Sequence, residues 1–263
     1  MNPDDPRRPT LYLVDASMYV FRAWHSMPDE FHDAEGWPTN AVQGFARFLL
    51  ELLERERPGH VVVAFDEALD SCFRNALYPA YKANRDPAPE ELKRQFGADK
   101  DLSQLLEAGD EQWDFARGQR WGMDGVKDRQ GVHAHQVADY LALCGDAVDN
   151  IPGVPGIGAK TAALLLAHFD TLDALLERVE EIPFLRFRGA ASTAAKLRAH
   201  GEQARLFRKL TTIACDAPLD HDRDFARGNA DGDALQALCE AMRFGPMTRR
   251  RLHEAAGLEF MPA

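Results

Sequence analysis

Residues 145–161 read GDAVDNIPGVPGIGAKT, and this stretch decides the fold of the chain around it. Asp146 and Asp149 follow an apolar run, and a helix through that run would project both carboxylates from one face. The prolines and glycines of Ile151–Gly158 predict sharp turns, and the apolar spacing of Ala159–Phe169 predicts a new helix. The sequence therefore predicts an acidic pair beside a tight loop that feeds a helix.

This loop has the features of a phosphate-binding turn. A glycine-rich turn before a helix directs free backbone N–H groups outward, and Lys160 adds a positive charge. A nucleotide-binding P-loop is excluded, because Lys160-Thr161 comes one residue late and the loop follows a helix-like run rather than a strand. Plainer interpretations stay open for each feature alone, namely helix-end aspartates and a simple helix–helix connection.

The composition is that of a folded, acidic protein of one large or two smaller domains, with 263 residues, 45% hydrophobic and 28% charged. The net charge of −11 argues against nonspecific coating of nucleic acid, although local basic patches remain compatible with it. No apolar run is long enough to span a membrane, and the first ten residues lack a signal-peptide core. We expect a cytoplasmic protein, because the four cysteines are scattered without a C-x-x-C pair.

An aspartate follows each of two predicted buried strands. Leu11–Val14 precedes Asp15, Val61–Phe65 precedes Asp66, and a helix to about residue 56 lies between them. In a parallel α/β sheet both acids would lie at the carboxyl edge, where such sheets place their sites. A single polar residue at a strand end has no special meaning, but two matched ones favour a site.

Residues 67–97 interleave basic and aromatic side chains, including Arg74, Tyr81, Lys82 and Arg85. Cations for phosphates and rings for stacking suit single-stranded nucleic acid. The alternative is a solvated loop with a few anchoring aromatics. We favour the first interpretation because the rest of the chain is acidic.

The remaining pattern is a weak alternation at 111–121, which indicates an edge hairpin, and then a largely helical region. Basic residues at 190–209 offer a second contact with duplex, although a solvated helical face is favoured for most of them. The predicted helices are 134–144, 159–169, 171–180, 190–200, 202–213, 232–243 and 248–256.

Six aspartates from four places could form one metal site. Gathered at one sheet edge, they would repel one another by roughly 4 kcal/mol per pair at 4 Å and an effective dielectric near 20, so the cluster needs cations. Carboxylates without His or Cys select Mg²⁺ or Mn²⁺ over zinc, and two such ions promote phosphodiester hydrolysis. The six are Asp15, Asp66, Asp99, Asp101, Asp146 and Asp149.

Five motifs in this order resemble the bacterial 5′-nuclease family, which comprises the 5′–3′ exonuclease domain of DNA polymerase I and stand-alone flap endonucleases. They are LYLVD (11–15), VVVAFD (61–66), FRNALYPAYKANR (73–85), ADKD (98–101) and GDAVDNIPGVPGIGAKT (145–161). The last motif is very specific, and the resemblance covers roughly residues 9–240.

The resemblance implies an α/β fold with a PIN-like, parallel-sheet nuclease core at 1–132, which includes an arch region at 67–97. A mainly helical C-terminal domain at 133–263 follows, with a helix–three-turn–helix element at 136–169 that grips duplex DNA. By the same resemblance, a single-stranded flap threads through the arch over the active site.

The resemblance also implies roles for individual residues. The six aspartates match metal ligands for Mg²⁺ or Mn²⁺, and Arg74, Tyr81, Lys82 and Arg85 match the arch base that handles the scissile phosphate. The loop matches the duplex-binding turn, where family members can also hold K⁺. Its DNA-binding residues would be Ile151, Gly153, Val154, Gly156, Ile157, Gly158, Lys160 and Thr161.

The chain departs from the family before Asp99. The family carries a Glu-Ala-Asp-Asp cluster on a helix between the arch and the D-K-D motif, followed by a strand. Here Arg94–Gly97 runs directly into Ala98, so several tens of residues are missing. Ligands for one of two metals would be lost, while Asp99, Asp101, Asp146 and Asp149 could still hold the other.

The sequence thus predicts a Mg²⁺-dependent 5′–3′ exonuclease or flap endonuclease acting on 5′-ended or branched DNA in replication or repair. We expect a monomer that acts alone or beside a separate DNA polymerase, with no membrane partner. A catalytically weakened or inactive DNA-structure-binding protein of the same family is the alternative. A PIN-type ribonuclease is a second one, against which the duplex-binding loop argues.

Overall fold

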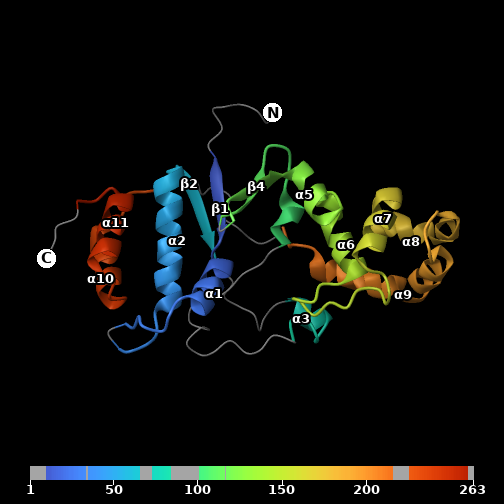
Figure 1. The fold of residues 1–263 in the computed structure, drawn as a ribbon, viewed down its shortest axis with the longest axis horizontal. Coiled ribbons are helices and arrows are strands. Elements are labelled where there is room, and N and C mark those ends of the chain that lie inside the picture. Colours follow the sequence, from blue (N-terminus) through green and yellow to red (C-terminus); the bar gives the residue numbers. More distant parts are fainter. Residues whose placement is uncertain are drawn as a thin grey trace. The chain divides into compact units, whose positions relative to one another are not determined.

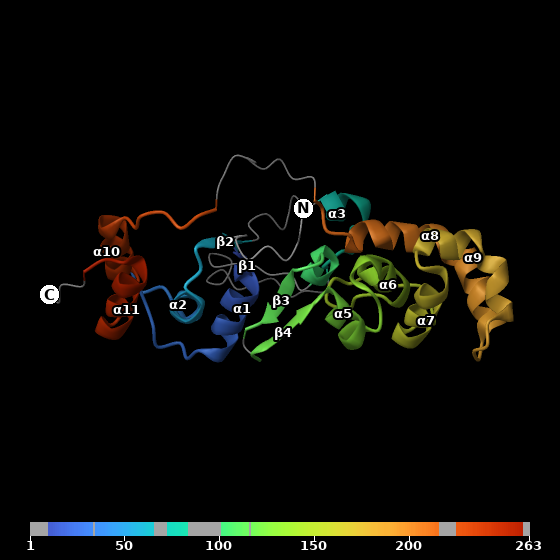
Figure 2. The same cartoon turned by 90° about the horizontal axis from the view of Figure 1, so that it is seen from above.

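The computed structural model describes residues 10–33, 35–65, 73–83, 101–115, 117–215 and 225–259. These residues form mostly helices, with two short two-stranded sheets (Figures 1 and 2). They divide into two compact units. One unit joins the described residues up to 65 with 225–259, and the other joins 73–83 with 101–215.

The first unit begins with a strand–helix–helix–strand arrangement: β1 (Leu11–Asp15), α1 (Ala16–Ser26), α2 (Asn40–Glu56) and β2 (His60–Ala64). The strands pair in parallel, with Leu11 opposite His60 and Asp15 opposite Ala64. A parallel pair requires a crossover connection, which the two helices provide. The predicted strand, helix and strand are confirmed, whereas α1 was not predicted.

Helices α10 (Gly232–Ala241) and α11 (Pro246–Ala256) complete this unit beside α2 (Figure 1). Arg251 on α11 donates two hydrogen bonds, of 2.7 and 2.8 Å, to the carboxylate of Glu54 on α2. The amide of Gln43 donates to the carbonyl of Met242 at 3.2 Å. These polar contacts therefore hold the C-terminal helices to α2, although the joined residues are almost 200 positions apart in the sequence.

The second unit starts with α3 (Phe73–Leu77), the 3₁₀ turn η2 (Asp101–Leu105), and the hairpin β3 (Glu111–Asp114) and β4 (Gln119–Gly122). The strands pair antiparallel, which confirms the predicted hairpin. Helix α5 (Met123–Gln130) and the turn η3 (Ala134–Gln136) follow.

The rest of this unit is helical: α6 (Val137–Cys144), α7 (Ala159–Phe169), α8 (Leu172–Glu177), η4 (Val179–Phe184) and α9 (Ala190–Thr211). Helix α6 lies beside α9 (Figures 1 and 2). Their shared core contains large, fully buried side chains, including Leu143, Leu165, Leu166, Leu172, Leu197 and Phe207. In the part of the chain that the structure describes, no helix is both long and apolar enough to cross a bilayer.

Helix α9 differs from the prediction, which placed a break at Gly201. The helix continues through this residue. A Cβ built on Gly201 would lie 3.2 Å from Cδ2 of Leu176, so the glycine gives room for close packing. Glycine weakens an isolated helix by about 1 kcal/mol relative to alanine, but tertiary packing supplies most helix stability in proteins.

Candidate functional site

The aspartates of the GDAVDN motif lie in a closed turn and not on a helix. Gly145 ends α6 with φ +87° and ψ 164°, a conformation that glycine adopts without strain, so the predicted helical placement of Asp146 and Asp149 is wrong. Asp146 and Ile151 then exchange two backbone hydrogen bonds of 2.8 Å each. This bridge closes the turn and fixes both aspartates next to the start of the glycine-rich loop.

Both carboxylates of this turn are buried, with residue exposures of 6% for Asp146 and 5% for Asp149. Asp146 Oδ1 accepts a hydrogen bond from the Val148 N–H at 2.9 Å. Asp149 Oδ2 accepts one from the Tyr81 hydroxyl at 2.9 Å, and its Oδ1 lies 3.7 Å from Lys82 Nζ. A buried carboxylate is tolerated only when it is paired or hydrogen-bonded, so Tyr81 and Lys82 stabilise Asp149.

The segment that carries Tyr81 and Lys82 is fixed to the turn by its backbone as well. The Lys82 N–H donates to the Asp149 carbonyl at 2.9 Å, and the side-chain amide of Asn150 donates to the Ala80 carbonyl at 2.6 Å. Asn150 and Lys82 both have positive φ, of 57° and 56°. The structure thus brings together four of the predicted site residues from positions up to 68 residues apart: Tyr81, Lys82, Asp146 and Asp149.

The side chain of Arg74, on α3, contacts the C-terminal end of α9. Its Nε donates to the Leu210 carbonyl and its Nη2 to the Thr212 carbonyl, each at 2.7 Å. Carbonyls at a helix C-terminus lack intrahelical partners, and a cation is favourable there. Arg74 therefore joins the α3 segment to α9 through at least two of its five donors.

Asp15 ends β1, at the carboxyl edge of the sheet as predicted, and also caps α1. Its Oδ1 accepts a hydrogen bond from the Ser17 N–H at 3.2 Å. Asp101 is the first residue of η2. Asp66, Asp99 and Arg85 lie outside the described residues. Within the described ranges, no group of three or more His, Cys, Asp or Glu side chains could hold a metal ion.

The loop from Ile151 to Gly158 is held by its apolar side chains. Ile151, Val154 and Ile157 are 2–3% exposed and belong to the core. The Val154 N–H donates to the Leu143 carbonyl at 2.8 Å, and the Ile157 N–H to the Val154 carbonyl at 3.0 Å. The side chains of these three predicted DNA-binding residues therefore lie in the core, and their backbone N–H groups are already used within the protein.

Glycine is required at one position of this loop by both backbone and space. Gly153 has φ +68°, and a Cβ there would lie 2.4 Å from the Gly145 nitrogen and 2.7 Å from the Leu143 carbonyl oxygen. Gly158 occupies the N-cap of α7, and Lys160 is exposed in the first turn of that helix. The predicted loop and the helix that follows it are confirmed.

The basic residues of α9 divide into two kinds. Arg198 pairs with Glu180, Arg205 with Asp173 and Glu202, and Arg208 with Asp173. Lys196 instead donates from Nζ to the Gly156 carbonyl at 3.3 Å. The sequence assigned Lys196 only to a general basic region, because no local pattern joins residues that are 40 positions apart.

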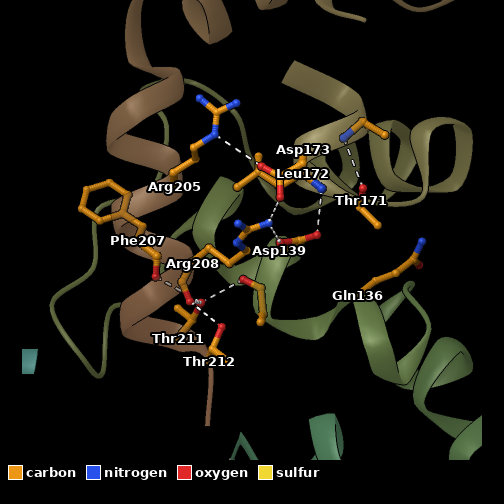
Figure 3. A network of polar contacts seen from close by, with 12 residues as sticks. Gln136, Asp139, Thr171, Leu172, Asp173, Arg205, Phe207, Arg208, Thr211 and Thr212 are labelled. Atoms are coloured by element: carbon orange, nitrogen blue, oxygen red, sulfur yellow. Dashed lines mark hydrogen bonds and ion pairs between the residues drawn. The ribbon is translucent and has the colours of Figure 1, made fainter. Parts of the chain in front are cut away.

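A polar network joins α6, α8 and α9 (Figure 3). Asp139 on α6 accepts a hydrogen bond from the Leu172 N–H of α8 at 2.7 Å, and its Oδ1 lies 3.8 Å from Arg208 Nη1 on α9. Arg208 also contacts Asp173 Oδ2 at 2.6 Å. Burial raises the pKa of Asp139, while the Leu172 N–H and the Arg208 charge act in the opposite direction.

Two models of one family match the chain. The "5′-3′ exonuclease, N-terminal resolvase-like domain" matches residues 10–108, and the "5′-3′ exonuclease, C-terminal SAM fold" matches residues 132–232. Together they cover most of the 263 residues and follow one another in the expected order.

Curated relatives agree with these models. DNA polymerase I of Rhizobium leguminosarum is 34% identical over 291 aligned positions, which cover 91% of this chain and 28% of the relative. DNA polymerase I of Pseudomonas aeruginosa is 34% identical, with coverages of 93% and 32%. DNA polymerase I of Bacillus subtilis is 32% identical, with coverages of 81% and 29%. The chain thus spans about a third of the length of these relatives.

The alignment with the Rhizobium relative also bears on the missing segment. Since 91% of 263 residues is about 239, about 50 of the 291 aligned positions have no residue in this chain. This number agrees with the several tens of residues that the sequence lacks relative to the family.

Solved structures share the fold. The T5 5′-exonuclease with bound zinc has a TM-score of 0.56 at 16% identity, covering 95% of this chain and 99% of that one. A bacteriophage T5 flap endonuclease complex with DNA and metal ions has a TM-score of 0.57 at 17% identity, with coverages of 94% and 99%. The catalytic core of Rad2 with DNA substrate has a TM-score of 0.60 at 14% identity, with coverages of 94% and 91%.

The fold therefore combines a PIN-like α/β core with a mainly helical C-terminal region, as predicted, and the family model describes that region as a SAM fold. From its family models, its polymerase relatives and this fold, the chain belongs to the 5′–3′ exonuclease family.

Proposed function

We propose that the chain is a metal-dependent nuclease that hydrolyses DNA phosphodiester bonds at 5′ ends or flaps, in replication or repair. The observation that supports this proposal most is the convergence of Tyr81 and Lys82 on Asp149, in a turn that leads directly into the glycine-rich loop. A proposed metal-binding carboxylate, a cation and the proposed duplex-binding loop then belong to one continuous piece of structure. Membership of the 5′–3′ exonuclease family supports the reaction class.

The acidic residues are proposed to bind Mg²⁺ or Mn²⁺. The donors of Asp146 and Asp149 are carboxylate oxygens, which fit a hard divalent cation. In the proposal, Asp15, Asp66, Asp99 and Asp101 complete the cluster for one ion, or for two as in the family. Such ions, when bound, activate a water and stabilise the leaving oxygen.

The basic residues are proposed to orient the phosphate. Lys82 neutralises Asp149 in the present geometry, and its side chain is 14% exposed. If the Asp149 carboxylate held a divalent cation, the Lys82 ammonium would be free to contact a phosphate oxygen, and Arg85 would add a second positive charge. The Tyr81 hydroxyl, by donating to Asp149, holds that carboxylate in place. Arg74 holds the segment that carries Tyr81 and Lys82 to α9 through its hydrogen bonds.

The loop is proposed to bind the duplex part of the substrate. Its exposed backbone at Gly156 and Gly158, with Lys160 and Thr161 in the first turn of α7, suits a DNA phosphate. A monomer in the cytoplasm, and the division into domains at 1–132 and 133–263, are parts of the same proposal.

A second function is favoured by one observation. About 50 aligned positions of the polymerase relatives have no residue here, and only two buried carboxylates gather in the described turn. If the absent positions include metal ligands, the chain binds branched DNA without cutting it.

The experiment that separates the two functions is cleavage of a 5′-labelled DNA flap in Mg²⁺, in Mn²⁺ and in EDTA, with binding measured in parallel. Asp146→Asn and Asp149→Asn keep hydrogen-bond acceptors but lose the charge, and Asp128→Asn on the exposed face of α5 is the matched control. We expect metal-dependent cleavage that falls by at least about 100-fold in the two site variants and is unchanged in the control.

The other results also have a definite meaning. Salt-sensitive flap binding without cleavage in either metal supports the second function. Cleavage that survives in both site variants means that Asp146 and Asp149 are not the metal ligands.

A further inference from the structure

Lys196 lies directly against the duplex-binding loop. Its Nζ donates to the Gly156 carbonyl at 3.3 Å. A Cβ built on Gly156 would lie 2.3 Å from that Nζ and 3.3 Å from Cε, so any larger residue at 156 would displace the lysine. Gly156 also has φ +74°, which glycine adopts without strain. The loop and the lysine are therefore matched in shape.

The partner of Lys196 is a carbonyl and not a carboxylate. Among the described residues, the arginines at 198, 205 and 208 of the same helix make ion pairs, whereas Lys196 makes none. An ammonium group has three N–H donors, and the Gly156 carbonyl uses one of them. The remaining donors and the full positive charge are thus available at the surface of the loop.

A cation at this position has a clear chemical use. A backbone carbonyl oxygen binds an ammonium group or a K⁺ ion in the same way, through its negative dipole end. A positive charge held there lies beside the loop N–H groups that suit a phosphate. Either cation would fix the turn and attract the DNA backbone.

We propose that Lys196 is a built-in cation of the loop and takes the part that a bound K⁺ could play. It holds the Gly156 carbonyl with one donor and offers the others to a phosphate of duplex DNA. The inference rests on the proposed duplex-binding function. It implies that this chain orders its loop and binds duplex without K⁺.

The test compares the wild type with Lys196→Met, which keeps much of the side-chain length but not the charge, and with Lys196→Arg, which keeps the charge. Lys209→Met is the matched control, because Lys209 is an exposed lysine of the same helix with no ion pair in the described part of the chain. Two quantities are measured, each in KCl and in tetramethylammonium chloride at equal ionic strength. One is the affinity for a labelled blunt duplex in EDTA, and the other is amide hydrogen exchange of residues 151–158 without DNA.

We expect the wild type to have the same affinity in both salts within about twofold, and the same exchange. Lys196→Met should lose about tenfold in affinity in tetramethylammonium and recover part of it in KCl, with slower exchange of the loop in KCl. Lys196→Arg should keep most of the affinity. Lys209→Met should lose less affinity for the duplex, and the loss should be equal in both salts.

The opposite pattern overturns the inference: a wild-type loop whose exchange slows in KCl as much as that of Lys196→Met. Absence of duplex binding by the wild type in both salts would instead refute the proposed function of the loop. The exchange experiment still decides the role of Lys196 in that case, because it needs no DNA.

Discussion

At Gly153 the backbone leaves no room for a side chain. A side chain here would place its Cβ 2.4 Å from the Gly145 nitrogen, and it would also be strained by the φ of +68°. Gly153→Ala should therefore lower the free energy of unfolding by about 3 kcal/mol or more. Gly158→Ala, where nothing lies within 4 Å and φ is negative, should cost about 1 kcal/mol or less as an N-cap change. Urea unfolding of both variants checks this; equal losses would contradict the packing of the loop.

Asp139 predicts a pH dependence of stability. Burial raises its folded-state pKa, so the folded protein takes up this proton at a higher pH than the unfolded chain. The resulting stabilisation is complete below the unfolded pKa and is lost as the pH rises through the folded pKa. The wild type should therefore gain stability relative to Asp139→Asn as the pH falls from 7 to 4. Urea unfolding across this range tests it, with Asp128→Asn as control; a constant difference would refute it.

The sequence identified most chemically important residues but not their contacts. Asp146, Asp149, Tyr81 and Lys82 were all predicted as site residues, yet their types and spacing gave no sign that Tyr81 and Lys82 contact Asp149. Such a contact depends on how the chain returns after dozens of residues. Local patterns contain no information on that path, which is also why Lys196 was missed as a loop contact.

Among the elements, periodicity was reliable and boundaries were less so. The apolar spacing of α7 predicted its range, because a single face of the helix is buried. The predicted end of α6 at residue 144 is confirmed, whereas the predicted break in α9 is wrong, and both depend on single glycines. Gly145 ends a helix through a positive φ, while Gly201 stays inside one because Leu176 packs against it. Residue type alone does not distinguish these two uses of glycine.

Helix α9 carries a prediction at the scale of elements. Arg208 joins α9 to Asp173 in the first turn of α8 and to the buried Asp139 of α6. Arg208→Met would leave the Asp139 carboxylate without its nearby cation, and we expect a loss of about 2 kcal/mol in unfolding free energy. Arg198→Met removes an exposed pair with Glu180 on the same helix and should change stability little. Equal effects in urea unfolding would mean that Arg208 does not hold the helices together.

For the whole molecule, the net charge of −11 predicts that DNA binding is local and limited to few phosphates. With Lys160, Lys196 and the loop as contacts, the plot of log affinity against log salt should have a slope of about −2 to −3. Lys160→Ala should reduce its magnitude by about 1, and Lys209→Ala should leave it unchanged. Duplex binding at three NaCl concentrations measures the slope. A slope unaffected by Lys160→Ala would exclude that lysine as a phosphate contact.

The way each unit is assembled has a consequence for how the protein is made in the cell. Arg74 reaches the Leu210 carbonyl across 136 residues, and Arg251 reaches Glu54 across 197. A ribosome releases the chain from its N-terminus, so α2 emerges long before α11, which packs against it. Contacts of such long range form slowly. The first unit must therefore remain partly open until α11 has been synthesised, and a premature stop before residue 251 would leave α2 without this contact.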